Sequence, residues 1–182
     1  MSHVRIAENV RLPKEIWLAG KGTSLDKYDW SQAGDCRIGI NETAFLVPKC
    51  TGAIAVDFNV LKKYRKLPPE MLVYRKSTHV KYQYPNMYIW TKGVEAHNLH
   101  ATAPIAIQLF NYLGAQIIHF VGFDSYSEQT NKHKARPDFA DCIKKISGEG
   151  INMNNYRKIN LVMSKLIIKL GLTAIWEHEQ CK

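Results

Sequence analysis

The stretch from residue 16 to residue 25, IWLAGKGTSL, constrains the fold more than any other part of the chain. An apolar run stops at Gly20-Lys21-Gly22 and gives way to Thr23-Ser24, a pattern that predicts a strand, a glycine turn and a helix start. Glycines can take a positive φ and carry no Cβ, so a ligand can approach the main chain there. The free N–H groups of the helix start, aided by its dipole, would face an anion. We expect a phosphate-bearing ligand, although a tight turn without a ligand has the same pattern, because the stretch is neither GxGxxG nor a Walker loop.

The size and composition of the chain indicate one compact domain over residues 1–182. The chain has 182 residues, of which 46% are hydrophobic, enough to fill a single core. No apolar run is as long as a membrane span, and the first residues lack the apolar core of a signal peptide, so we expect a cytoplasmic protein. The cysteines are far apart without a CxxC pair, which predicts reduced thiols rather than a zinc site or disulfides (Cys36, Cys50, Cys142 and Cys181).

The formal net charge of +9 indicates an anionic partner. A nucleotide, a nucleic acid, an acidic glycan and a membrane surface would all satisfy it. The basic residues occur in separate clusters rather than in one block, and each cluster taken alone fits an ordinary solvated surface.

Short, continuous apolar runs alternate with segments of helical spacing along most of the chain. This alternation is typical of an α/β fold with a Rossmann-like, mostly parallel sheet and helices on both faces. An edge strand is predicted over residues 87–91, within a segment rich in tyrosine. The other predicted strands are residues 16–19, 37–40, 53–56, 71–74, 116–124 and 172–176. Helices are predicted from Val60 to Tyr64, from Thr102 as N-cap to Leu113, and over residues 152–170.

Polar residues follow several of the predicted strands. In doubly wound sheets, ligands bind outside the carboxyl ends of the strands. We therefore expect five residues from distant parts of the sequence to meet at one crevice: Ser24, Asn41, Asp57, Thr102 and Asp124. His119, by contrast, lies inside an apolar strand and is predicted to be a paired core residue. His97 and His100 have a spacing that suits a metal, but no third ligand accompanies them.

Residues 125–150 show no periodicity and are rich in polar side chains. A long polar loop beside the crevice is a candidate lid, and a mobile surface loop has the same composition. As a lid it would bring substrate contacts from Tyr126, Lys132, His133, Lys134 or Arg136.

Three motifs together resemble a known superfamily: GKGTSL after a strand, a strand ending in INE, and HATAPIAIQLFNYLGAQIIHFVGFDSY. They are similar to motifs of the bacterial lipooligosaccharide sialyltransferases, of the related motility accessory factors and of an archaeal pterin pyrophosphokinase-like group. The resemblance implies that Gly20, Gly22, Thr23 and Ser24 wrap the phosphates and ribose of a nucleotide, that Asn41 holds the donor near its phosphate, and that Thr102 contacts the nucleotide. It also implies that Asp124 and Tyr126 belong to the segment whose tyrosine stabilises the departing phosphate. No metal is needed in that scheme, because hydroxyl and amide donors support the leaving group.

The chain departs from the family pattern at three places. Lys21 stands where the family has asparagine, and it could neutralise a phosphate or signal another donor. Thr23 replaces a proline. The family's histidine base is missing from residues 147–152, so Glu149 or His133 would have to accept the proton of the acceptor hydroxyl.

Three functions are therefore open from the sequence. The leading hypothesis is a metal-independent glycosyltransferase without a cofactor, which takes a nucleotide-activated sugar as donor and a glycan or polymer as acceptor. The second is pyrophosphoryl transfer, in which Asp57 and Asp124 would hold a divalent metal such as Mg²⁺. The third is a module that binds a nucleotide or nucleic acid without catalysis.

Overall fold

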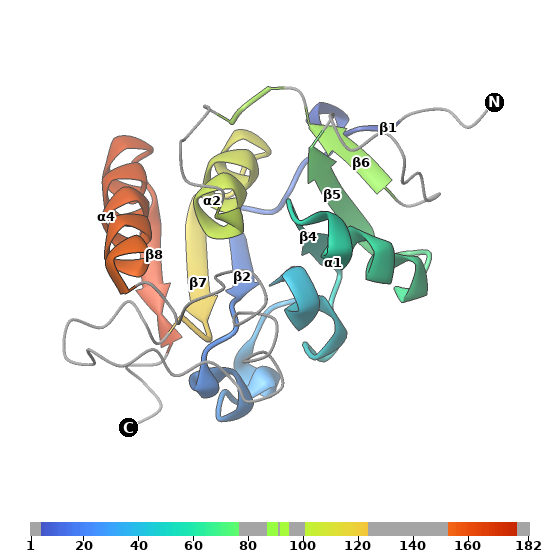
Figure 1. Cartoon of the computed structure of the whole chain (residues 1–182), viewed down its shortest axis with the longest axis horizontal. Helices are drawn as coiled ribbons and strands as arrows, with labels where there is room; N and C mark the ends of the chain where they lie inside the picture. The colour runs from blue at the N-terminus through green and yellow to red at the C-terminus, as the bar shows by residue number, and fades with distance from the viewer. Residues whose placement is uncertain (1–4, 77–86, 91, 95–100, 124–152, 178–182) are drawn as a thin grey trace.

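The computed structural model describes residues 5–76, 87–90, 92–94, 101–123 and 153–177 (Figure 1). The strands are β1 (Arg5–Ile6), β2 (Glu15–Ala19), β3 (Arg37–Ile40), β4 (Gly52–Ile54), β5 (Leu72–Lys76), β6 (Met87–Trp90), β7 (Ile117–Val121) and β8 (Thr173–Trp176). The α-helices are α1 (Phe58–Lys63), α2 (Thr102–Tyr112) and α4 (Met153–Lys169). The short 3-10 helices are η1 (Ala7–Asn9), η2 (Thr23–Asp26), η3 (Trp30–Gln32), η4 (Asn41–Phe45) and η5 (Tyr64–Lys66).

The described strands form one eight-stranded sheet in the order β1-β6-β5-β4-β3-β2-β7-β8. Every pairing between neighbouring strands is parallel. The chain builds the sheet outward from β2 through β3, β4, β5 and β6, then returns to the other side of β2 to add β7 and β8. The strand order thus reverses between β2 and β7, which is where a doubly wound sheet opens a crevice at its carboxyl edge.

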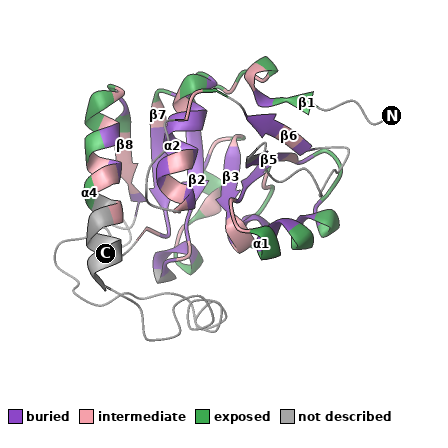
Figure 2. Cartoon of the chain, turned by 45° about the horizontal axis from the view of Figure 1, so that its top comes forward, coloured by how far each residue is buried: buried purple, intermediate pink, exposed green. Residues whose placement is uncertain are grey.

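Both faces of the sheet are covered, because successive side chains of each strand point to opposite faces. Ile16 and Leu18 lie in the same apolar cluster as the inner sides of α2 and α4. Ala53 and Val73 point the other way and belong to a cluster with residues of α1 and η5. Figure 2 shows the buried strands between these layers. The predicted Rossmann-like α/β fold with a parallel sheet is confirmed.

Helix α2 begins one residue earlier than predicted. Ala101 is the N-cap and Thr102 is the first helical residue, so Thr102 does not cap the helix. Its buried side includes Leu109 and Phe110, whereas Tyr112 is 46% exposed. Gly114 follows the helix with a φ of 119°, which a glycine tolerates.

The predicted edge strand is not at the edge. Strand β6 pairs with β5 on one side and with β1 on the other, through Arg5 with Tyr88 and Ile6 with Ile89. Two residues are too few for a periodic signal, so the sequence pattern did not indicate β1. Among the described residues, no helix combines the length and apolar character needed to cross a membrane.

His119 is a buried and paired residue of β7, as predicted. Its Nδ1 lies 2.5 Å from Oε1 of Glu177, and its Nε2 lies 2.7 Å from Oε1 of Glu15. The ring also stacks on Trp17, with ring centroids 4.1 Å apart. These contacts join β2, β7 and the residue that follows β8, and we call them the His119 clasp.

Cys36 and Cys50 are free thiols, in agreement with the predicted reduced state. Burial raises the pKa of both thiols to about 11, so both stay protonated at neutral pH. Cys142 and Cys181 lie outside the described residues.

Candidate functional site

Two glycines interlock at the point where the strand order reverses. The amide of Gly20 donates to the Val121 carbonyl at 2.8 Å, and the amide of Gly22 donates to the Gly122 carbonyl at 2.7 Å. A Cβ on Gly20 would lie 2.7 Å from the Gly122 oxygen, and a Cβ on Gly122 would lie 2.5 Å from the Gly20 oxygen. The loops after β2 and β7 therefore touch backbone to backbone at the carboxyl edge of the sheet.

The loop after β2 differs from the predicted glycine turn and helix start. Gly22 has a φ of −72°, and Gly20 is not among the residues with a positive φ. Residues Thr23–Asp26 form a single 3-10 turn rather than an α-helix. A single turn aligns few peptide units, so its dipole is weaker than that of the expected helix. Gly20 is required by its contact with Gly122, and the sequence alone did not reveal that neighbour.

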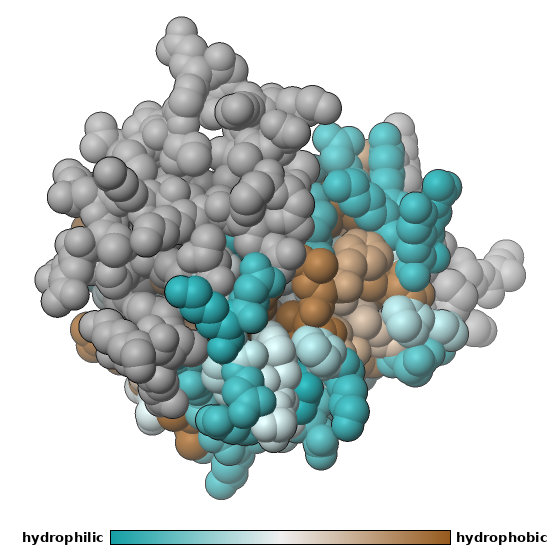
Figure 3. Space-filling view, turned by 90° about the horizontal axis from the view of Figure 1, so that it is seen from below, coloured by the Kyte–Doolittle hydropathy of each residue, from teal (hydrophilic) through white to brown (hydrophobic). Residues whose placement is uncertain are grey.

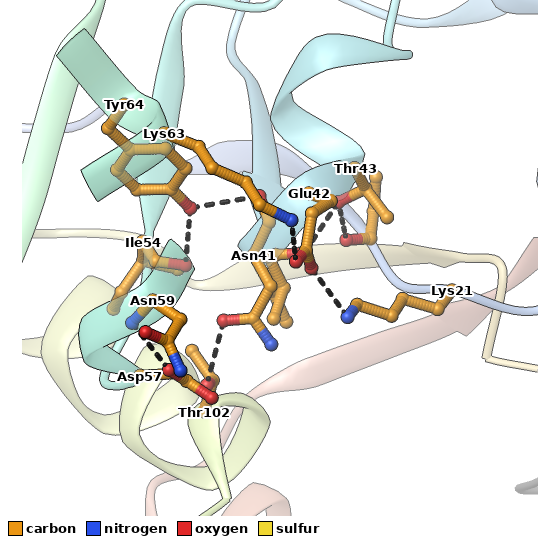
Figure 4. Close-up of polar contacts among 12 residues, drawn as sticks. Lys21, Asn41, Glu42, Thr43, Ile54, Asp57, Asn59, Lys63, Tyr64 and Thr102 are labelled. Carbon is orange, nitrogen blue, oxygen red and sulfur yellow. Dashed lines mark hydrogen bonds and ion pairs between the residues drawn. The ribbon is translucent and has the colours of Figure 1, made fainter. Parts of the chain in front are cut away.

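Asn41 occupies a special backbone position directly after β3. Its φ is 58°, in the left-handed region that asparagine tolerates better than most residues. Its Oδ1 accepts a hydrogen bond of 3.2 Å from the hydroxyl of Thr102, at the first turn of α2 (Figure 4). Within the part of the chain that the structure describes, the Nδ2 amide of Asn41 makes no hydrogen bond. That amide is available to donate to a ligand.

Two hydroxyl groups hold this turn in place. The Tyr64 hydroxyl lies 2.9 Å from the Asn41 carbonyl and 3.1 Å from the Ile54 carbonyl. Burial, with a smaller effect from the nearby Glu42 carboxylate, raises the pKa of Tyr64 well above its usual value, so the hydroxyl remains a donor. The buried Thr43 hydroxyl lies 2.9 Å from the Ala19 carbonyl and 2.8 Å from the Ile40 carbonyl. The ends of β2, β3 and β4 are thereby tied together.

Glu42 sits between two lysines beside Asn41. Its Oε2 lies 2.6 Å from Nζ of Lys21, and its Oε1 lies 3.1 Å from Nζ of Lys63 (Figure 4). Burial raises the pKa of the Glu42 carboxyl, but the hydrogen bond and charge of Lys21, a backbone hydrogen bond at Glu42 and the hydrogen bond of Lys63 together outweigh burial and hold the pKa below its ordinary value. Lys21, Glu42 and Lys63 together therefore carry one net positive charge. The ion pair with Glu42 also fixes the position of the Lys21 ammonium group.

Asp57 is the N-cap of α1, where its Oδ1 accepts a hydrogen bond of 2.7 Å from the Asn59 amide. Part of its hydrogen-bonding capacity is thus used in starting the helix. No group of three potential metal-ligating side chains occurs among the residues that the structure describes.

The structure places most of the predicted nucleotide-binding residues at the carboxyl edge of the sheet. These are Gly20, Lys21, Gly22, Thr23, Ser24, Asn41, Asp57 and Thr102. The direct contact between Asn41 and Thr102, which are 61 positions apart, agrees with the expected convergence. The other predicted residues lie outside the described ranges: Asp124, Tyr126, His133, Glu149 and the remainder of the candidate lid.

Sequence reasoning missed the residues that support Asn41. Glu42 and Thr43 directly follow Asn41 in the sequence, but only Asn41 was predicted to belong to the site. The carboxylate of Glu42 and the hydroxyl of Thr43, which come directly after a buried strand, were a pattern from which their place at the site could have been predicted. No sequence pattern indicated the role of Tyr64, because its position in the helical spacing is that of an ordinary core residue.

A comparison of the fold with solved structures finds similarity to sialyltransferases. The alpha-2,3/8-sialyltransferase CstII, solved as a mutant, is 16% identical with a TM-score of 0.55, over 90% of this chain and 81% of that chain. The sialyltransferase CST-II in complex with a trisaccharide acceptor and CMP is 16% identical with a TM-score of 0.54, over 90% and 80%. A CST-II variant in complex with CMP is 14% identical with a TM-score of 0.55, over 90% and 81%.

The chain has a sialyltransferase-like fold. The similarity extends over nearly the whole chain, and at this level of identity it establishes the fold alone. No protein-family model and no curated protein matches the sequence.

Proposed function

We propose that this sialyltransferase-like chain is a glycosyltransferase that takes a sugar from a nucleotide-activated donor and transfers it to a glycan or polymer acceptor. The observation that carries the proposal is the Nδ2 amide of Asn41 at the crevice, held by a left-handed backbone and by Thr102. The solved neighbours add support, because two of them contain CMP and one contains a trisaccharide acceptor.

The donor phosphate would lie between the Asn41 amide and the loop after β2. A fixed amide donor stabilises negative charge without having to reorganise when the sugar–phosphate bond breaks. Lys21 adds a positive charge nearby, with its position set by Glu42. The leaving phosphate would thus be stabilised by the chain's own groups, which is why we propose a reaction that needs neither a metal nor a resident cofactor.

The proton of the acceptor hydroxyl would be accepted by Glu149 or His133, and Tyr126 would assist the departing phosphate. These three assignments come from the sequence, and variants at each position test them by turnover. Asp124 would complete the nucleotide site from the end of β7.

The test is thermal stabilisation by nucleoside monophosphates and nucleotide sugars, with Mg²⁺ and with a chelator. A ligand that binds only the native state at about 100 times its Kd stabilises it by about 2.7 kcal/mol. For a chain of this size that is a rise in Tm of about 5–10 °C. We expect such a rise with one nucleotide family, unchanged by the chelator. A rise that requires Mg²⁺ would instead favour pyrophosphoryl transfer.

Asn41 variants show whether the ligand uses the proposed site. Asn41→Gly keeps the left-handed turn and removes the amide, so the protein should stay folded while the ligand-induced rise in Tm disappears. Asn9→Ala, an exposed asparagine of η1, is the matched control and should keep the full rise. An unchanged rise in Asn41→Gly would contradict the proposed site.

A further inference from the structure

Lys21 places a positive charge inside the loop that follows β2. The loop is fixed on both sides of this residue, because the amides of Gly20 and Gly22 donate to carbonyls of Val121 and Gly122. The Lys21 side chain is 23% exposed, so a ligand can reach it. In the superfamily that the sequence motifs resemble, this position is asparagine. The chain therefore differs from that superfamily by one positive charge in this loop.

Glu42 holds the ammonium group of Lys21 close to Asn41. Nζ of Lys21 lies 2.6 Å from Oε2 of Glu42, and Glu42 directly follows Asn41 in the chain (Figure 4). The Glu42 side chain is 12% exposed and also contacts Lys63 at 3.1 Å. Glu42 and Lys63 alone would cancel, so Lys21 leaves one net positive charge at this place. An ammonium group has three N–H donors and can contact a carboxylate and a phosphate oxygen together.

The Asn41 amide and the Lys21 ammonium group thus follow two neighbouring strands. Strand β3 precedes Asn41, strand β2 precedes Lys21, and the two strands pair directly. Figure 3 shows the molecule from below, the side toward which β2 and β7 point in Figure 1, with hydrophilic groups that border an apolar area. Paired strands are about 4.8 Å apart, and two linked phosphates share one bridging oxygen. One phosphate can therefore contact the amide while the next contacts the ammonium group.

We propose that the donor is a sugar joined to a nucleoside diphosphate and that Lys21 binds the second phosphate. This inference rests on the proposed function and deepens it by naming the class of donor. The neighbours solved with CMP contain a nucleotide with a single phosphate. A diphosphate carries one more negative charge, which matches the additional positive charge that Lys21 brings to this edge.

The same charge contributes to the transfer step. The bond between the sugar C1 and an oxygen of the terminal phosphate breaks, and the acceptor oxygen forms a new bond to C1. The electron pair of the broken bond stays on the diphosphate, which gains one negative charge, and the acceptor proton passes to the general base. A cation that is already in place stabilises this charge without reorganisation. Lys21 should therefore support the departure of the diphosphate as well as its binding.

The test compares each nucleoside diphosphate with the monophosphate of the same base by isothermal titration calorimetry. The probes are UDP, GDP, ADP and CDP against UMP, GMP, AMP and CMP. A chelator is present, and salt at about 0.15 M screens attraction by the net charge of the chain. A hydrogen bond between charged groups changes Kd by about tenfold or more. We expect one diphosphate to bind tighter than its monophosphate by at least this factor.

Variants of two lysines assign the preference to its residue. Lys21→Asn removes the charge and should weaken the diphosphate by about tenfold while the monophosphate changes little. Lys21→Arg keeps the charge and should retain a preference for the diphosphate. The matched control is Lys14→Asn, because Lys14 is exposed and directly precedes β2 at the opposite edge of the sheet. It should bind both nucleotides as the unmodified chain does, and circular dichroism shows that each variant is folded.

Three outcomes would overturn the inference. Equal affinity for the diphosphate and the monophosphate of every base would contradict the class of donor and leave the nucleotide site in place. A preference that survives in Lys21→Asn, or that Lys14→Asn loses to the same extent, would contradict the role of Lys21. Failure of every nucleotide to bind would contradict the proposed function itself, and this inference with it.

Discussion

The carboxylate of Glu42 fixes the charge of the candidate site, and its titration is open to measurement. A carboxyl group whose pKa is lower in the folded protein stabilises the fold above its unfolded pKa. This contribution is lost as the pH falls through the folded value. Lys21 and Lys63 give Glu42 such a lowered pKa.

We expect Glu42→Gln to lower the free energy of unfolding at pH 7 by about 1–2 kcal/mol. The difference in stability should begin to shrink as the pH falls below 4.5, the ordinary pKa of the group, and should vanish below the lower pKa of the folded protein. Urea unfolding across this pH range measures the difference. Glu70→Gln, at an exposed position, should change stability by less than about 0.5 kcal/mol at every pH. A Glu42 effect that persists in acid would show that the ion pairs are not its cause.

At the scale of elements, the loops after β2 and β7 are in backbone contact that leaves no room for a side chain. Gly122 has a φ of 73°, and a Cβ there would lie 2.5 Å from the Gly20 oxygen. Gly171 has a similar φ of 62°, but nothing lies within 4 Å of its Cβ position. An alanine substitution at Gly171 therefore tests the cost of the left-handed backbone alone, and one at Gly122 tests that cost together with crowding.

We expect Gly171→Ala to cost about 1 kcal/mol, the price of the left-handed conformation. Gly122→Ala should cost at least twice as much, because the loops must also move apart, and it should weaken nucleotide binding. Urea unfolding and the nucleotide-induced rise in Tm check both effects. Equal stability losses would mean that the backbone contact between the loops tolerates a methyl group.

Much of this arrangement of elements could be predicted from the sequence. The strands from β2 to β8 end close to their predicted residues, because a fully buried parallel strand is a short, continuous apolar run bounded by polar residues. The convergence of Asn41 and Thr102 followed from the rule that parallel strands share a carboxyl edge. Contacts between distant backbones were beyond prediction: neither the Gly20–Gly122 contact nor the pairing of β1 leaves a local pattern.

Across the whole molecule, the His119 clasp joins the early part of the chain to the residue after the last strand. It connects Glu15 in β2, His119 in β7 and the buried Glu177. Removing one partner of a buried hydrogen-bonded pair leaves the other partner unsatisfied, which is costly.

We expect His119→Phe to lower the free energy of unfolding by about 3 kcal/mol, and the double variant His119→Phe/Glu177→Gln to recover part of that loss. Urea unfolding of the unmodified chain, of His119→Phe, of Glu177→Gln and of the double variant gives the coupling energy between the two residues. If the two single changes simply add, the clasp is not a coupled unit.

The position of β2 between β3 and β7 also sets the order in which the molecule can assemble. On a growing polypeptide, β3 can pair with β2 soon after synthesis, but β7 reaches its register with residues 15–19 only when residues 117–121 have been made. Pairings between distant segments are slow to form. Until then one side of β2 is an open edge, which favours association with other chains. Pairing of β7 with β2 should therefore complete the candidate site and cover the open edge of β2 in the same step.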